Sequence, residues 1–225
     1  MDKNFMKRVP PLKERLPKIL SILKKTYPQA HCILQYKTPW QLLVAVQLSA
    51  QCTDVMVNKV TPALFEKYPT AQATAMAPIE DIERLIHSTG FYRNKAKNLK
   101  GAAQMVMEKF GGKVPGTMAE LISLPGVARK TANIILGNVF NIVEGIAVDT
   151  HVMRLSSRLG LTTNTNPDKI ERDLMQLLPK KEWFAFTYRI IDLGRAICKA
   201  PTPKCEICPL NKLCPSSYAS SSPSI

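Results

Sequence analysis

A lysine and an aspartate are the residues of this sequence whose types and positions best suit chemistry. Lys130 comes shortly after the turn LPGV (residues 124–127), in a run, RKTANIILGNVF, that is typical of a helix. Proline fixes φ and glycine tolerates positive φ, so the turn is tight and the amides of the following helix start lie beside it. Such a helix start binds anions, and a phosphate suits it. Asp149 stands at the next expected helix start, VDTH.

Each of these two residues also has a structural interpretation. Basic residues are common at helix starts, and an aspartate before a helix usually caps it. Taken one at a time, Lys130 and Asp149 favour that interpretation. A lysine in an anion-binding turn with a carboxylate nearby is nevertheless the starting point of a catalytic hypothesis, which the rest of the segment has to support.

Four cysteines near the end of the chain form a second group with chemical potential. They are spaced C-x6-C-x2-C-x5-C and can converge on one centre with little loop entropy to overcome. Zinc is one alternative, but four-cysteine zinc sites usually combine two well-separated C-x2-C pairs, and only one such pair is present. The other gaps, and the proline that follows two of the cysteines, favour a [4Fe–4S] cluster over zinc. The expected ligands are Cys198, Cys205, Cys208 and Cys214.

Charge is the outlier of the composition. The 225 residues include 31 Lys and Arg but 17 Asp and Glu, which gives a net charge of +14 at pH 7 and a pI of about 9.6. The excess is spread along the chain and favours nucleic acid as the partner. A membrane is the weaker alternative, because no lysine-rich amphipathic helix with aromatic anchors stands out. No targeting segment stands out either, so we expect a cytoplasmic protein, associated with the nucleoid if it is bacterial.

The catalytic candidates and the cysteines are expected to be positioned by helices, because apolar residues recur at helical spacing along the chain and strand signals are almost absent. The segment 41–50 is apolar nearly all round, so we expect it at the centre of the fold, behind a Thr38-Pro39 start. Pro62 is expected to divide or kink the helix that begins near residue 54. The tail, residues 216–225, is small, polar and expected to be disordered. The predicted fold class is all-α.

The segments around these sites resemble one family. LPGVARKTA resembles the helix–hairpin–helix of DNA-repair glycosylases, and VDTHV at this distance resembles the endonuclease III branch. The resemblance covers about residues 12–214, and the cysteine spacing is similar to that of the family's structural [4Fe–4S] cluster. It implies two lobes with a cleft between them. Residues 31–142 would form a six-helix barrel ending in the helix–hairpin–helix, and residues 1–30 and 143–215 a discontinuous iron–sulfur cluster domain.

The resemblance also gives roles to the two catalytic candidates. In the family, the residue that matches Lys130 is the nucleophile, and the residue that matches Asp149 is its essential partner; both would face the cleft. Lys130 would attack the anomeric carbon of an extruded nucleotide, and β-elimination would follow from the resulting imine. Asp149 would stabilise the oxocarbenium-like sugar and move a proton.

Two residues are expected to enter the DNA helix, again by resemblance. Gln51, in SAQCTD, would fill the space that a displaced base leaves, with a polar helix cap as the alternative. Phe91, in STGFYRNKA, would wedge beside the orphaned base, where an aromatic ring stacks well. The family often has a leucine at that position.

Other residues are expected to bind the phosphate backbone. The hairpin would do so at Gly126, Ala128 and Arg129, and the cysteine loop through Lys199 and Lys204, for which surface solubility is an equal alternative. Ala128 departs from the family's LPGVG. If that position needed positive φ, alanine would cost about 1 kcal/mol, so phosphate binding is expected to be weaker or slightly reshaped.

The predicted function is a bifunctional DNA glycosylase and abasic-site lyase that removes oxidised pyrimidines from duplex DNA in base excision repair. Its partner would be double-stranded DNA containing damaged bases or abasic sites, bound by a monomer. Two alternatives stay open. A monofunctional glycosylase of the adenine or mismatched-thymine type would generally lack the lysine. A non-catalytic DNA-binding or redox-sensing module would need only the basic charge and the cluster.

Overall fold

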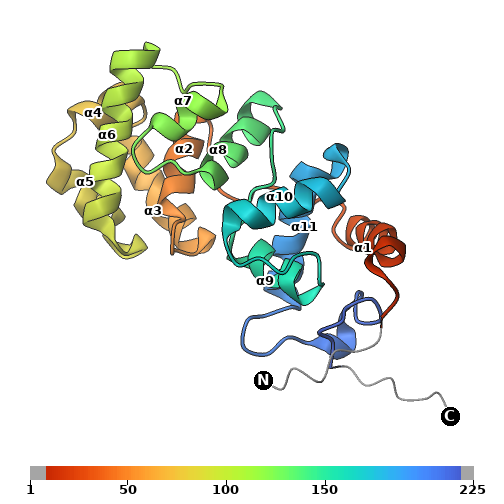
Figure 1. Cartoon of the computed structure of the whole chain (residues 1–225). Helices are drawn as coiled ribbons and strands as arrows, with labels where there is room; N and C mark the ends of the chain where they lie inside the picture. The colour runs from red at the N-terminus through yellow and green to blue at the C-terminus, as the bar shows by residue number, and fades with distance from the viewer. Residues whose placement is uncertain (1–8, 219–225) are drawn as a thin grey trace. The chain divides into compact units, whose positions relative to one another are not determined.

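The computed structural model describes residues 9–218, and within that range every regular element is a helix (Figure 1). The all-α fold class predicted from the sequence is confirmed. The chain separates into two compact units. We call residues 32–144 the hairpin unit, and the described parts of residues 1–31 and 145–225 the cysteine unit. The ranges expected from the sequence are 31–142, and 1–30 with 143–215.

The hairpin unit is built around α2, which is buried at every position after Pro39, as its all-round apolar sequence predicts. Helices α3, α6 and α8 pack against α2, and α4 and α5 lie beside α6 (Figure 1). The helical segments of this unit are α2 (Pro39–Leu48), α3 (Asp54–Lys67), α4 (Ala71–Met76), α5 (Ile79–Ile86), η1 (His87–Thr89), α6 (Tyr92–Phe110), α7 (Met118–Ser123), α8 (Arg129–Ile135) and η2 (Leu136–Phe140).

Threonine hydroxyls start four of these helices. Each accepts a hydrogen bond from the backbone N–H three residues further on, which satisfies one of the amides that have no partner within the helix. The N-terminal cap expected at Thr38 is confirmed. The four capping residues are Thr38 of α2, Thr53 of α3, Thr70 of α4 and Thr117 of α7.

Proline residues in this unit act differently from one another. Pro62 does not divide its helix, because α3 runs without interruption from Asp54 to Lys67. Buried residues on both sides of Pro62, among them Val57 and Leu64, hold the helix across the lost hydrogen bond. Pro78, in contrast, separates α4 from α5, since Ala77 before it is extended. The unit therefore has seven α-helices, α2 to α8.

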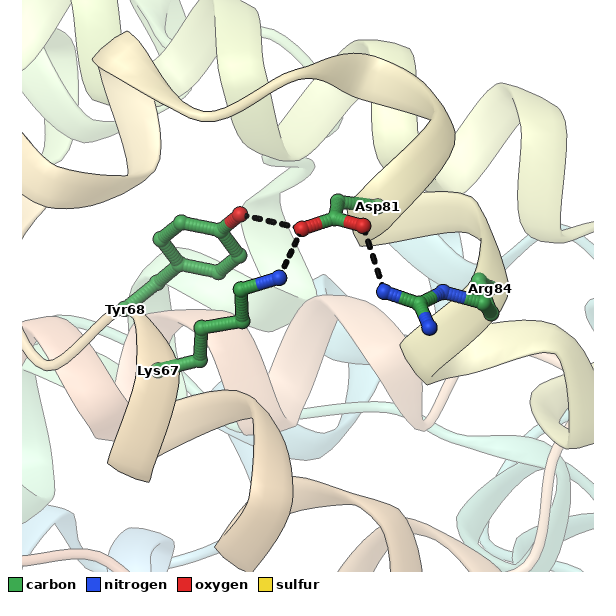
Figure 2. A network of polar contacts seen from close by, with 4 residues as sticks. All are labelled: Lys67, Tyr68, Asp81 and Arg84. Carbon is green, nitrogen blue, oxygen red and sulfur yellow. Dashed lines mark hydrogen bonds and ion pairs between the residues drawn. The ribbon is translucent and has the colours of Figure 1, made fainter.

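An aspartate ties α5 to the end of α3 (Figure 2). One oxygen of Asp81 accepts hydrogen bonds from the Lys67 ammonium and, at 2.7 Å, from the Tyr68 hydroxyl. The other oxygen pairs with the Arg84 guanidinium at 2.5 Å. These donors, Lys67 foremost, hold the pKa of Asp81 well below its usual range.

The cysteine unit joins the N-terminal helix to the last third of the chain. Helix α11 packs against both α1 and α9, around a core that includes Ile19, Val152 and Phe186. Its segments are α1 (Leu12–Thr26), α9 (Thr150–Arg158), α10 (Pro167–Leu177), η3 (Lys180–Glu182), α11 (Trp183–Ala196) and η4 (Cys205–Ile207).

The expected disordered tail, residues 216–225, lies mostly outside the described residues. Its first three residues are described: Ser217 is buried, and the Tyr218 hydroxyl donates a hydrogen bond to the Pro203 carbonyl. Among the helices within residues 9–218, none has the length and apolar character needed to cross a membrane.

Candidate functional site

The hairpin before Lys130 is fixed by contacts with two other helices of its unit. Gly126 has φ of +74°, and a Cβ there would lie 2.9 Å from the Cβ of Asn98 on α6. The adjacent Pro125 carbonyl accepts a hydrogen bond of 3.1 Å from the Gln47 side chain of α2. Only glycine combines this left-handed backbone with so close an approach, so the turn predicted from the sequence is a rigid one.

Lys130 is the second residue of α8, directly behind that hairpin. Its side chain is half-buried, as is that of Arg129, while Ala128 is the exposed N-cap residue. Ala128 has φ of −93°, in the extended region that any residue adopts. The strain considered for this alanine is therefore absent. The helix continues beyond α8 as the π-helical turn η2, and such turns are often found near functional sites.

Asp149 is the N-cap of α9. Its Oδ1 accepts a 2.8 Å hydrogen bond from the Val152 amide, which confirms the structural interpretation of this residue. The side chain is half-buried, between buried Val148 and exposed Thr150. A cap uses one lone pair of a carboxylate, so this contact is compatible with the catalytic role, which stays a prediction. Lys130 belongs to the hairpin unit and Asp149 to the cysteine unit.

Gln51 and Phe91, the two residues expected to enter DNA, share an unusual backbone. Both lie in the left-handed region, with φ of 52° and 49°, and both side chains are exposed. Among residues 9–218 only one other non-glycine residue, Asn141, has positive φ. Phe91 exposes 65% of its surface. The sequence contained no signal for this shared conformation.

The four candidate ligands gather in the cysteine unit, with none of them in a disulfide. Cys205 is buried and the other three are half-buried. Burial raises the pKa of Cys208 and raises that of Cys214 to about 11, and the charges of the other thiols act in the same direction. The thiols are thus near enough to influence one another.

Sulfur donors in this number fit a soft metal centre, either iron–sulfur or zinc. The raised pKa values of Cys208 and Cys214 favour the protonated thiols, so a metal that binds these two sulfurs must displace their protons. Within residues 9–218, no set of three His, Cys, Asp or Glu side chains is arranged to hold a single metal ion.

Two arginines of α9, which the sequence analysis missed, hold the loop that carries these cysteines. Arg158 donates to the Cys198 Sγ at 3.2 Å and to the carbonyls of Lys199 and Ala200, both at 2.8 Å. Arg154 donates to the Cys198 carbonyl at 3.0 Å. Their i, i+4 spacing was the available signal, since it places both on one face of a helix. It did not indicate which segment that face would meet.

A third arginine, Arg15 of α1, is buried and donates to the carbonyls of Leu159 and Leu213. It ties the N-terminal helix to the cysteine loop. The two lysines expected to contact DNA from this loop, Lys199 and Lys204, are both exposed. Their amides both donate to the Ile197 carbonyl at 3.0 Å, which gives the loop a compact start.

Comparisons with known proteins agree on one family. The family model described as HhH-GPD superfamily base excision DNA repair protein matches residues 44–180. A protein of Synechocystis sp. named endonuclease III is 57% identical over 96% of this chain and 99% of its own length. One of the same name from Bacillus subtilis is 46% identical over 84% of this chain and 86% of its own.

A solved structure is similar over the same range. It is a trapped covalent intermediate between an endonuclease III and DNA, and it superimposes with a TM-score of 0.88 at 44% identity. The match covers 92% of this chain and 98% of the chain in that structure. The likeness therefore extends over most of the chain.

Proposed function

This chain belongs to the HhH-GPD superfamily of base excision DNA repair proteins, and from that membership we propose the roles of its residues in an endonuclease III-type reaction. The chain is a base excision repair DNA glycosylase with lyase activity, and it acts on DNA. The finer statements, which concern its substrate, its catalytic pair and its cluster, are proposals.

The nucleophile is Lys130. The observation that carries this proposal is its place directly behind a rigid hairpin, in a chain 44% identical to an endonuclease III that was trapped in a covalent intermediate with DNA. A covalent intermediate requires a nucleophilic side chain, and a lysine amine forms an imine with a sugar carbon. Lys130 is half-buried, so its amine is accessible to a nucleotide extruded from the duplex.

The reaction proceeds in two stages. The Lys130 amine forms a bond to C1′ of the extruded nucleotide while the bond from C1′ to the base breaks, and the base leaves with a proton. Opening of the sugar gives an imine, which acidifies the C2′ proton. Removal of that proton expels the 3′ phosphate oxygen, so the strand breaks by β-elimination, and water then releases the enzyme. Asp149 stabilises the positive charge that develops on the sugar and transfers protons.

The substrate class is oxidised pyrimidines in duplex DNA, which rests on the resemblance to the endonuclease III branch. Gln51 fills the space left by the extruded nucleotide and Phe91 wedges beside the orphaned base, and the exposure of both side chains supports these roles. Gly126, Ala128 and Arg129 place the hairpin amides against a phosphate, and Lys199 and Lys204 bind phosphates from the cysteine loop.

The four cysteines hold a [4Fe–4S] cluster, with Cys198, Cys205, Cys208 and Cys214 as ligands. Their uneven spacing, with a single C-x2-C pair, supports this over zinc. When bound, the cluster is a structural centre that stiffens a basic loop. Arg158 and Arg154 hold that loop on α9.

Borohydride trapping tests the central proposal. The wild-type chain should form a covalent adduct with abasic-site duplex DNA in the presence of borohydride, whereas Lys130→Gln should form none and should still bind that DNA. Lys113→Gln, which removes an exposed lysine from the loop after α6, is the matched control and should trap normally. Full trapping by Lys130→Gln would assign the nucleophile to another amine. No trapping by the wild type would favour the monofunctional or non-catalytic alternatives.

A further inference from the structure

Lys95 is a buried lysine that the proposed reaction does not use. It lies on α6, and only 7% of it is exposed. Its ammonium donates two hydrogen bonds to backbone carbonyls, at 2.9 Å to Leu48 and at 2.8 Å to Thr89. Leu48 is the last residue of α2 and Thr89 the last of η1, so one side chain joins the ends of two helical segments.

Each of those ends leads directly to a residue proposed to enter DNA. Gln51 follows Leu48 by three positions, and Phe91 follows Thr89 by two. The backbone amide of Lys95 also donates to the Phe91 carbonyl, at 3.1 Å. Lys95 therefore holds one of these segments by its side chain and the other by both side chain and backbone.

The backbone of Gln51 and Phe91 explains why such a tie is needed. A left-handed conformation is unfavourable for residues other than glycine and persists only where the surroundings fix it. Both residues are exposed and have this conformation. A carbonyl bonded to an ammonium is held more strongly than one bonded to a neutral donor. Loss of the ammonium would leave two carbonyls without this partner. It would release the segment of Gln51 and leave the segment of Phe91 held by the backbone bond alone.

We propose that Lys95 is a positioning residue, which holds the segments of Gln51 and Phe91 together as one preformed wedge that enters the duplex in a single step. The inference rests on the proposed function, in which Gln51 fills the space of the extruded nucleotide and Phe91 wedges beside the orphaned base. A preformed wedge avoids the entropy of ordering two separate loops when DNA binds. Lys95 is not a second nucleophile, because its burial keeps the amine away from a sugar carbon.

A double-mutant cycle tests this proposal on the full chain. Lys95→Met keeps the length of the side chain and removes the ammonium, and it is combined with the pair Gln51→Ala and Phe91→Ala. Lys100→Met is the matched control, since Lys100 also lies on α6 and donates at 2.6 Å to one carbonyl, that of Ala77, before α5. Single-turnover base excision is measured on damaged duplex, with 2-aminopurine beside the lesion to report unstacking by its fluorescence.

Lys95→Met should slow base excision about tenfold and reduce the fluorescence rise, as expected when residues in contact lose their coupling. In the Gln51→Ala, Phe91→Ala background the same substitution should have little further effect. Lys100→Met should leave both signals unchanged. Melting temperatures are measured first, and if Lys95→Met does not fold, Lys95→Gln, which keeps a neutral donor, takes its place in every arm.

Three results would overturn the inference. Equal slowing in both backgrounds would mean that Lys95 only stabilises the unit in general. An unchanged rate in Lys95→Met, with slowing by the Gln51→Ala, Phe91→Ala pair, would remove the inference and leave the proposed function intact. No effect of that pair, in a protein that still traps through Lys130, would refute the insertion of these two residues and the inference with it.

Discussion

Asp149 combines two tasks that a single carboxylate can perform together. As the N-cap of α9 it accepts the Val152 amide, and any good acceptor of similar size can do that. As the proposed partner of Lys130 it needs a negative charge and a transferable proton, which an amide lacks. Asparagine is as good an N-cap as aspartate, so the substitution Asp149→Asn separates the two tasks.

Asp149→Asn should leave the melting temperature almost unchanged while base excision slows by about 10²–10⁴-fold, the usual contribution of a general acid or base. Asp149→Ala should lose the cap as well, which costs about 1 kcal/mol of stability. Cleavage of a preformed abasic site should be less affected in Asp149→Asn, since that substrate has no base to remove. Thermal unfolding and single-turnover assays on both substrates measure these effects. If Asp149→Asn excises the base at the wild-type rate, the role of Asp149 is only to cap α9.

At the scale of elements, Asp81 joins α5 to the end of α3 through three donors, and its depressed pKa determines how that contribution depends on pH (Figure 2). A carboxyl whose pKa is lower in the folded state makes its full contribution to stability when the pH is above its pKa in the unfolded chain, which is about 3.9. The contribution is lost as the pH falls through the depressed folded value. It should therefore be constant across neutral and mildly acidic pH.

The variant Asp81→Asn should melt below the wild type by the same interval at pH 7 and pH 5.5, because both lie above that unfolded pKa. The interval should shrink only when the pH falls below about 4. Glu80→Gln, with the same charge change at an exposed position of α5, is the control and should shift the melting temperature less. An interval that already closes between pH 7 and pH 5.5 would contradict the depressed pKa.

The cysteine loop is the second element whose behaviour can be predicted. Protein purified without exposure to air should be yellow-brown and contain about four irons per chain, as a four-cysteine [4Fe–4S] site requires. Cys205→Ser, at the buried ligand, should lower the iron content and the melting temperature of the cysteine unit. Cys52→Ser, outside this group, should leave both unchanged. One zinc per chain in a colourless sample would refute the cluster.

For the whole molecule, the net charge of +14 suits a chain that acts on DNA, which is a polyanion. Each phosphate that a lysine or arginine neutralises releases counterions, so binding weakens as salt rises. If about six phosphates are contacted, the affinity for undamaged duplex should fall on the order of 10³-fold between 50 and 200 mM salt. A flat response would mean that the basic residues do not face the DNA.

The salt slope also tests the two lysines of the cysteine loop. Replacing Lys199 and Lys204 together by glutamine should reduce the slope by about two, one for each lost phosphate contact. Lys109→Gln, at an exposed position late in α6, is the control for the loss of a surface charge. An unchanged slope in the double variant would restrict these lysines to surface solubility. Fluorescence anisotropy at several salt concentrations supplies the measurement.

Features that depend on residues a few positions apart could be predicted from the sequence. The cap at Thr38, the tight turn at Gly126 and the burial of α2 follow from local side-chain chemistry and helical period. The spacing of the four cysteines and the hairpin string were sufficient to indicate the family. The division of the helix expected at Pro62 is absent, because buried neighbours on both sides outweigh one missing hydrogen bond.

Contacts between groups far apart in the chain could not be predicted in this way. The Lys95 ammonium reaches a carbonyl 47 positions away, and Arg158 reaches the Cys198 sulfur 40 positions away. A helical pattern states which face of a helix is buried, but the partner of that face depends on how whole helices pack, which local periodicity does not contain. The left-handed backbone conformations of Gln51 and Phe91 could not be predicted from the sequence for the same reason. Their conformational cost is balanced by contacts that exist only in the folded unit.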